Sequence, residues 1–510
     1  MLKRVAEQPS DKAISRRRFL RLTGAATAGA ILSACAPAAP SVIKETVEVI
    51  SEVEKEVEVT REVEVEKVVT AVPEPEQITM TVATDWNSGP RKEFYDAMTV
   101  HFQEMHPNVT VEVWHMGGGG SSGPGGMADI VRAQILTGTA ADVIQGMSVG
   151  SLDFATPYLL DLTDIAAGLG WDRKDYYYNP AQSYSADGKL RVLPFNVAVT
   201  GWMYNKTMFE EEGLAEPTDD WDWNDLVEAA RALTKPETGQ FGVRATGPGV
   251  WTSGAEHMWA AGATWFNKDW ASSGMCKERG PEMFEAWIDL IYKDKVSPQP
   301  GEIAGMLSGG VTNPFASGKI GMFCMGLQAT GDLMRQIGDR FVASVMPTPK
   351  DPETGLRTTQ EINDGHAVFV EAGERGTATY AVEYIMEAIG DFGQEIVVNT
   401  APCFPTNKKW AHSEEMLEPP PLNRGQILTN SETYEPMPLM WCEHWGEANR
   451  AFRAEYDKAW TGEIPARECL AAACQAFDAA LAPYKNEIKP WPYDFGFPLE
   501  GLSRANSEYY

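Results

Sequence analysis

Basic residues are scarce in this chain of 510 residues. Lys and Arg number 43 against 72 Asp and Glu, which leaves a formal net charge of −29 at pH 7. The first 34 residues carry an excess of basic side chains, so the rest of the chain is more acidic still. Such a charge argues against DNA, RNA or an anionic membrane surface as a partner. The length exceeds what one hydrophobic core organises and suffices for two or three domains.

Cysteine is also scarce, and its spacing has no metal signature. None of the seven Cys lies in a Cys-x-x-Cys pair or a zinc-type array. A His-Glu-x-x-His pair is absent, and the Gly-rich segment lacks the Lys-Ser/Thr of a phosphate-binding loop. We therefore expect no metal and no cofactor. The spacing alone assigns no disulfide.

One local pattern resembles the site of an esterase. His115-Met116 followed by four Gly resembles an oxyanion loop, and residues 146–150 (GMSVG) resemble a nucleophile elbow around Ser148. However, Pro157 is poorly placed for the helix that should follow an elbow. The two motifs are also too close in sequence for the intervening elements of a hydrolase sheet. We therefore expect that the protein is not an enzyme, and we keep an exported esterase that uses Ser148 as an alternative.

The apolar stretch near the N-terminus, residues 22–34, is too short to span a bilayer as a mature helix. Residues 15–21 (SRRRFLR) before it resemble a twin-arginine export signal, and residues 32–35 (LSAC) resemble a bacterial lipobox. We expect residues 1–35 to be a signal and the mature chain to begin at a lipidated Cys35, because several acyl chains anchor stably.

Residues 36–76 are low in complexity, with Val alternating with charged residues, mostly Glu. We expect a spacer between the lipid anchor and the globular body. A coiled-coil partner is the alternative, although no heptad is sustained.

From about residue 77 the sequence alternates between two periodicities. ITMTVATDW, NVTVEVWHM and ADVIQG have the character of strands, and the segments between them carry apolar residues at helical spacing. This alternation predicts a parallel sheet. Ligands of such sheets lie beyond the C-terminal strand ends, which fall here at residues 85–87, 115–116 and 146–148.

The stretch from residue 188 to 214, GKLRVLPFNVAVTGWMYNKTMFEEEGL, carries apolar residues on both faces. This predicts a buried strand that Pro194 must interrupt, followed by a short helix that stops at Gly213. Further along, a turn is expected at residues 362–365 before the strand AVFVEAG.

Four stretches occur in a characteristic order: the 188–214 segment, WDWNDLVEAARALT, PFASGKIGMFCMG and WTGEIPARECLAAACQAF. Together they resemble the extracellular solute-binding proteins of ABC importers, in the sugar-binding group that includes maltodextrin-binding proteins. The resemblance covers about residues 77–481. It implies an α/β, two-lobed periplasmic-binding-protein fold, type II-like, in which each lobe is a mostly parallel sheet flanked by helices and crossing strands join the lobes.

The resemblance also implies where the chain crosses between the lobes. Crossings are expected at residues 197–200 and 364–367, and a third near residues 425–435. The implied lobes are residues 77–198 with 365–425, and residues 199–364 with 426–510.

A pyranose presents an apolar face that stacks on Trp, and its hydroxyls need carboxylate or amide partners. The chain has 16 Trp. Topology places Trp86 beyond a strand end, and the resemblance implies that Trp265 and Trp441 line the ligand site, with Trp445 one turn further on. Where the family often has Gly-Pro-Trp this chain has Gly326-Leu327-Gln328, so the sugar of a maltodextrin binder does not transfer. The predicted ligand-binding residues are Asp85, Trp86, Asn87, Met147, Thr200, Trp265, Gln328, Asp364, Trp441 and Trp445.

These features predict an exported, lipid-anchored binding protein on the extracytoplasmic face of the membrane or in the periplasm. We expect a monomer that captures a mono- or oligosaccharide and presents it to the transmembrane subunits of an ABC permease. The alternative ligands are a glycerol-phosphate ester, a polyamine or a peptide. Few basic residues near the predicted site count against a phosphate.

The lipobox interpretation predicts the effect of Cys35→Ser. The variant should lack lipid and be released from the membrane, because the acyl chains supply the anchoring free energy. Membrane fractionation with metabolic acyl labelling measures both. A labelled, membrane-bound variant would contradict the lipobox.

Overall fold

The computed structural model describes residues 76–116, 127–147, 153–177, 183–185, 188–245, 254–267, 269–307, 311–327, 330–400, 403–436 and 444–488. Cys35, Ser148, Gln328 and Trp441 lie outside these ranges. Within them, none of the helices combines the length and apolarity needed to cross a bilayer.

The first lobe begins with a parallel ladder, as the sequence predicts. Strand β1 (Ile78–Thr84) pairs in parallel with β2 (Val109–His115) on one side and with β3 (Val143–Met147) on the other. Helices α2 (Gly89–Met105) and α3 (Met127–Thr137) connect these strands. The three C-terminal strand ends therefore lie at one edge of the ladder.

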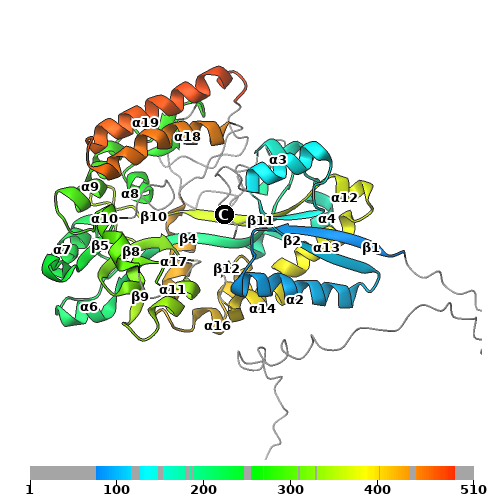
Figure 1. Cartoon of the computed structure of the whole chain (residues 1–510), viewed down its shortest axis with the longest axis horizontal. Coiled ribbons are helices and arrows are strands. Elements are labelled where there is room, and N and C mark those ends of the chain that lie inside the picture. The colour runs from blue at the N-terminus through cyan, green and yellow to red at the C-terminus, as the bar shows by residue number, and fades with distance from the viewer. Residues whose placement is uncertain are drawn as a thin grey trace, which may run out of the picture. The chain divides into compact units, whose positions relative to one another are not determined.

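Two long strands join the lobes (Figure 1). Strand β4 (Leu193–Asn205) pairs antiparallel with β11 (Glu361–Val368) through its first half and with β8 (Ile320–Gly326) and β9 (Ala343–Met346) through its second half. Strand β11 continues beside β3. One sheet, in the order β2-β1-β3-β11-β4-β8-β5, thus runs through both lobes.

The interruption predicted at Pro194 is confirmed. The partners of β11 jump from Asn196, opposite Asp364, to Pro194, opposite Gly365, so the ladder has an irregularity at this point. Pro lacks the N–H that a regular ladder needs there. The turn expected at residues 362–365 is wrong, because β11 runs through these residues and accommodates Pro194 with this register shift.

Residues near 425–435, where a third crossing was expected, form α17 (Gly425–Thr433), a helix that packs against β4. The helix approaches closely because β4 has Gly201 at the contact. A Cβ there would lie 2.5 Å from Asn430 Nδ2 and 2.6 Å from a methyl carbon of Leu327.

The second lobe combines a short parallel pair with helices. Strand β5 (Phe241–Arg244) pairs in parallel with β8. Helix α7 (Trp223–Leu233) starts with a capping box between Asp222 and Asp225. The helix predicted after β4 is α6 (Lys206–Glu211), and Gly213 follows it with a φ of +67°.

The remaining helices and strands complete both lobes. They are α4 (Thr163–Gly168), α8 (Ala255–Ala260), β6 (Thr264–Phe266), β7 (Ser273–Gly274), α9 (Gly280–Tyr292), α10 (Pro300–Ile303), α11 (Thr330–Ile337), β10 (Thr358–Thr359), α12 (Glu371–Glu374), α13 (Ala378–Ile389), α14 (Asp391–Thr400), β12 (Phe404–Pro405), α15 (Lys408–Ala411), α16 (Glu414–Leu417), β13 (Glu435–Pro436), α18 (Trp445–Tyr456) and α19 (Ala466–Leu481).

A disulfide ties the C-terminal helical pair to the rest of the second lobe. It joins Cys276, just before α9, to Cys474 of α19. The cysteine spacing had assigned no bridge, because 198 residues separate the two positions.

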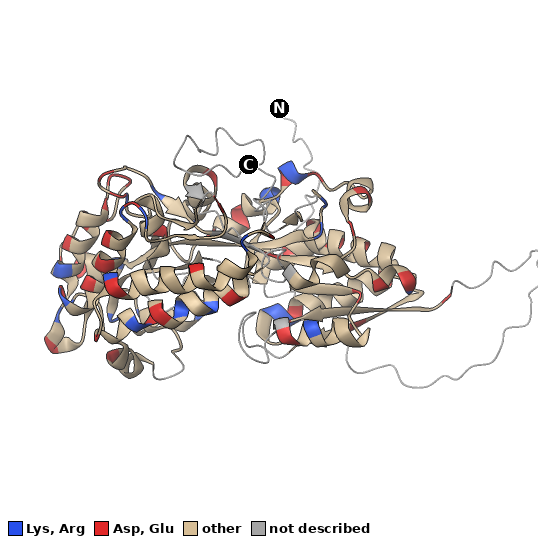
Figure 2. Ribbon diagram, turned by 90° about the horizontal axis from the view of Figure 1, so that it is seen from above, with Lys and Arg blue, Asp and Glu red and all other residues tan. Residues whose placement is uncertain are grey.

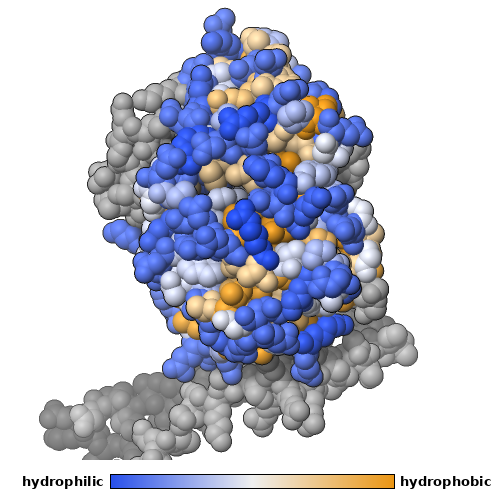
Figure 3. Space-filling view, turned by 90° about the vertical axis from the view of Figure 1, so that its left-hand side faces the viewer, coloured by the Kyte–Doolittle hydropathy of each residue, from blue (hydrophilic) through white to orange (hydrophobic). Residues whose placement is uncertain are grey.

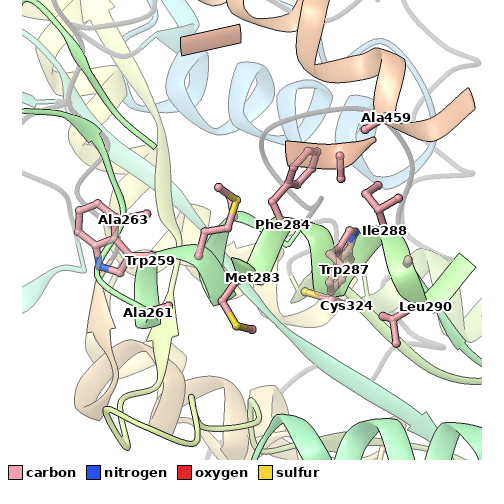
Figure 4. Packing of buried hydrophobic residues seen from close by; sticks show 14 of the residues in the cluster. Trp259, Ala261, Ala263, Met283, Phe284, Trp287, Ile288, Leu290, Cys324 and Ala459 are labelled. Atoms are coloured by element: carbon pink, nitrogen blue, oxygen red, sulfur yellow. The ribbon is translucent and has the colours of Figure 1, made fainter. Parts of the chain in front are cut away.

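The second lobe has an aromatic core (Figure 4). Trp287 of α9 lies beside Cys324 of β8, and the ring of His257 packs among Trp202, Trp223 and Trp287 with centroids 4.8 to 5.7 Å away. His257 Nε2 is buried and finds no hydrogen-bond partner among the described residues. Burial in this apolar setting lowers the pKa of His257 to about 3.

The surface is polar and of mixed charge. Acidic and basic residues are interspersed over the outer helices (Figure 2), and the face seen in Figure 3 is mostly hydrophilic with small, separate apolar areas. Neither view shows a concentrated basic face.

The buried His257 predicts a specific acid sensitivity. Its folded-state pKa lies below the ordinary 6.5, so the ring is neutral when folded and takes up a proton on unfolding. The stabilisation that the neutral His257 ring gives to the folded state is therefore complete above pH 6.5. As the pH drops toward 3, the free energy of unfolding falls by up to about 1.4 kcal/mol per pH unit. His257→Phe should reduce this slope, measured by urea unfolding between pH 6.5 and 4.

The exposed His412, 49% accessible, gives the matched control. His412→Phe should keep the acid slope that His257 causes. An unchanged slope in His257→Phe would contradict the neutral, buried state of His257.

Candidate functional site

The candidate site lies midway along β4, on one face of the two crossing strands. On this face Val192, just before β4, belongs to an apolar cluster of the first lobe, and Trp202 belongs to the core of the second. Asn196, Ala198 and Thr200 lie between these two cores. Ala198 is the one residue of β4 that is not buried. The opposite face is closed, because Val197 and Val199 pack in a cluster with Ile427 of α17. We call the open side the crossing face.

Strand alternation brings β11 residues to the same face. The β4–β11 register is regular from Glu361 opposite Val199 to Asp364 opposite Asn196. Asp364 therefore shares the crossing face with Asn196, and Asn196 Nδ2 donates to Asp364 Oδ2 at 3.4 Å. The pair places a carboxylate and an amide side by side in the middle of the molecule.

Asp85, directly after β1, adds a second carboxylate. Burial raises the pKa of Asp85, against the lowering effect of the Arg91 guanidinium. Burial and the negative charge of Asp85 raise the pKa of Asp364. Gln145 of β3, in the amide orientation that satisfies both its ends, donates to Asp85 Oδ1 at 3.0 Å. Among the described residues, the site thus has two mutually repelling carboxyls and one nearby cation, the Arg91 guanidinium.

Arg91, Asn196 and Gln145 are site residues that the sequence interpretation missed. Arg91 lies in the first turn of α2, and its guanidinium carbon is 5.3 Å from the centre of the Trp86 ring. Its position shortly after a C-terminal strand end was a usable signal. Asn196 and Gln145 gave none, because an amide inside a strand is not distinctive in sequence.

Trp86, the neighbour of Asp85 in sequence, is buried in the core of the first lobe. The Trp86 ring is 2% exposed and packs against Phe94 and Tyr95 of α2, and against Phe195, with centroids 5.1 to 6.0 Å away. The ring is part of the first core, while Asn87 beside it is exposed.

The predicted tryptophans of the second lobe lie together in its core. Trp265 is 1% exposed, and its ring meets Trp445 edge to face at 5.2 Å. The structure thus brings Trp265 and Trp445 together in one core and places Trp86 in the other. Stacking of these rings on a ligand stays a prediction.

Two further predicted residues are part of the sheet. Met147 ends β3 opposite Gly365 of β11. Thr200 is buried, and its Oγ1 accepts from the Gln360 N–H at 2.8 Å while its carbonyl accepts from Asn430 Nδ2 at 3.3 Å. Of the predicted residues with described side chains, Asp85, Asp364 and Thr200 are the polar ones that this arrangement brings to the crossing face or its edge.

The family of the chain follows from comparison with known sequences. Residues 84–386 match the family of bacterial extracellular solute-binding proteins. The match covers more than half of the 510 residues, and the chain belongs to this family.

Individual relatives are distant. A binding protein of Brucella abortus strain 2308 is 24% identical over 260 residues, which are 50% of this chain and 60% of that protein. The mannitol-binding protein of Pseudomonas aeruginosa is 26% identical over 203 residues, 38% of this chain and 43% of that protein. The chain therefore matches no more than about 60% of the length of these curated relatives.

Structural similarity covers a larger share of the chain than sequence similarity does. An ABC substrate-binding protein of Listeria monocytogenes, solved in complex with cycloalternan, superposes with a TM-score of 0.66 at 18% identity. The superposition covers 80% of this chain and all of that one. This confirms the predicted two-lobed periplasmic-binding-protein fold.

The raised pKa of Asp364 predicts the effect of removing its charge. The folded-state pKa exceeds that of the unfolded chain, so the ionised form opposes folding, and stability is lost as the pH rises from the ordinary value of 3.8 through the raised one. Asp364→Asn should therefore raise the free energy of unfolding of the ligand-free protein at pH 7, on the order of 1 kcal/mol. Thermal melts at pH 7 and pH 3.5 measure the gain and its disappearance.

Asp391 offers a control of opposite sign. The hydrogen bond from Lys409 lowers the pKa of this exposed carboxyl. Asp391→Asn should bring no gain at pH 7. A loss of stability in Asp364→Asn at pH 7 would refute the unfavourable charge.

Proposed function

We propose that this protein is a lipid-anchored, extracytoplasmic binding protein that captures a carbohydrate and presents it to an ABC-type importer. The observation that carries the proposal is the polar group on the crossing face, where Asp85, Asp364 and Asn196 lie between the cores of two lobes. Family membership supports a binding role.

The chemistry of these residues suits hydroxyl groups. Ionised carboxyls accept hydrogen bonds, protonated ones donate, and an amide does both, so the set matches a ligand rich in hydroxyls. Burial raises the pKa of both Asp85 and Asp364, so each carboxyl ionises less readily than a free one. In the described part of the site, a phosphate ester would meet two acidic groups and the guanidinium of Arg91. The relatives agree with this chemistry, since one is a mannitol-binding protein and one similar fold holds cycloalternan.

Capture would proceed by closure about the crossing strands. A ligand on the crossing face contacts both lobes and binds the closed arrangement better than the open one, which shifts the population toward closure. The permease would then distinguish the closed form. No bond is made or broken, so the proposed role needs binding alone.

A thermal-shift screen tests the ligand class. The panel comprises glucose, mannitol, maltose, maltotriose and cycloalternan, with spermidine, glycerol 3-phosphate and a tripeptide as the other classes. A sugar present at 100 times its Kd should stabilise the protein by about 2.7 kcal/mol. Calorimetry then measures the affinity.

Matched variants link binding to the crossing face. Asp85→Asn/Asp364→Asn should weaken sugar binding by about 1–3 kcal/mol, and Asp391→Asn should not change it. Stabilisation by spermidine, the phosphate or the peptide alone would overturn the carbohydrate proposal, as would a panel in which no sugar binds.

A further inference from the structure

Gln360 is a buried residue whose side-chain amide lacks a hydrogen-bond partner among the described residues. It immediately precedes β11, and its backbone is held on both sides, since Gln360 N donates to Thr200 Oγ1 at 2.8 Å and its carbonyl accepts from Thr200 N at 3.0 Å. The residue is 1% exposed. Nevertheless, neither Nε2 nor Oε1 of its side chain has a hydrogen-bond partner in the described ranges.

Other buried glutamines are satisfied. Gln394 Nε2 donates to the Phe195 carbonyl at 3.3 Å and to the Ala388 carbonyl at 3.1 Å. Gln426 Nε2 donates to Asn430 Oδ1 at 3.1 Å and to the Tyr434 hydroxyl at 2.9 Å. A buried amide without partners destabilises the folded state, so a residue such as Leu would be the better choice at position 360 for folding alone.

The position of Gln360 relates it to the candidate site. The regular register of Glu361 to Asp364 against β4, continued by the Thr200 contacts, places Gln360 on the crossing face with Asp364. The two residues are four positions apart, which corresponds to roughly 13 Å along the strand. Asp364 lies at the first-lobe end of this row, and Gln360, beside Thr200, lies at the second-lobe end.

We propose that Gln360 is a ligand-binding residue and that the preferred ligand is an oligosaccharide of at least two sugar units. This inference rests on the proposed function. Nε2 donates to one ligand hydroxyl and Oε1 accepts from another, as two adjacent hydroxyls of a sugar ring allow. The backbone positions of Asp364 and Gln360 are further apart than the width of one pyranose, so two linked sugar units match the length of this row better than one.

The test compares Gln360→Leu with the unchanged protein on two probes, maltotriose and glucose. Leu has a similar size and removes both unpaired polar atoms, so the free variant should melt at the same temperature or higher. Its affinity for maltotriose should fall about ten- to a hundredfold, while its affinity for glucose should not change. Calorimetry gives the affinities and calorimetric melts give the stability.

Gln240→Leu is the matched control. Gln240 lies at the start of β5 and its Nε2 donates to the Leu233 carbonyl at 2.7 Å, so its loss should lower the melting temperature slightly and leave both affinities unchanged.

The outcomes separate this inference from the proposed function. If the unchanged protein binds sugars but Gln360→Leu keeps its affinity for maltotriose, the inference is wrong and the function stands. It is equally wrong if Gln360→Leu melts lower and weakens both probes alike, since that reports a structural role, or if the unchanged protein prefers glucose. If no sugar binds the unchanged protein, the proposed function fails and the inference fails with it.

Discussion

The antiparallel pairing of β4 with β11 is the constraint on which the remaining structure depends. Each strand passes from one lobe to the other, so their shared ladder fixes where both lobes meet. A slip of one residue would turn Asn196 and Thr200 toward α17 and bring Val197 and Val199 to the crossing face. The burial of the two valines against α17 therefore also determines which side chains are offered to a ligand.

The same pairing limits how the two lobes can move relative to each other. Each lobe is held together by strand pairing and an apolar core, and only a few residues of the crossing strands lie between the cores. Gly201 permits α17 to lie directly on β4. The proposed closure would change the distance between the cores of the two lobes, while the pairing of β4 with β11 keeps the polar residues of the crossing face together.

The sequence pattern predicted those features of the fold that depend on residues close together in the chain. The β1–β3 ladder and the interruption at Pro194 follow from periodicity and from the hydrogen-bonding capacity of single residues. The strand-end rule also pointed to Asp85, whose negative charge acts on Asp364 in the structure. The β11 register shift was mistaken for a turn, because Asn363-Asp364-Gly365 has turn composition and the demand for a shift comes from Pro194, far away in sequence.

The sequence alone could not predict into which core each large side chain packs. Trp86 follows Asp85 directly, and only the position of α2 decides that its ring enters a core. The Trp265–Trp445 contact joins β6 to α18, which no spacing rule connects. Gln360 looks ordinary in sequence, because only the structure shows that its amide has no hydrogen-bond partner among the described residues.

The disulfide makes the stability of the fold depend on whether the chain is in reducing or oxidising surroundings. Cys276 and Cys474 enclose a loop of 198 residues that contains β8, β9 and β11. In the chain-entropy model, closing so long a loop lowers the entropy of the unfolded chain and stabilises the folded state by up to about 5 kcal/mol. Disulfides do not persist in a reducing cytosol and form in oxidising surroundings. Before oxidation the chain is thus easier to unfold, and afterwards the helical pair α18–α19 is locked to the second lobe. The bridge makes the chain most durable in the compartment where a solute-binding protein works.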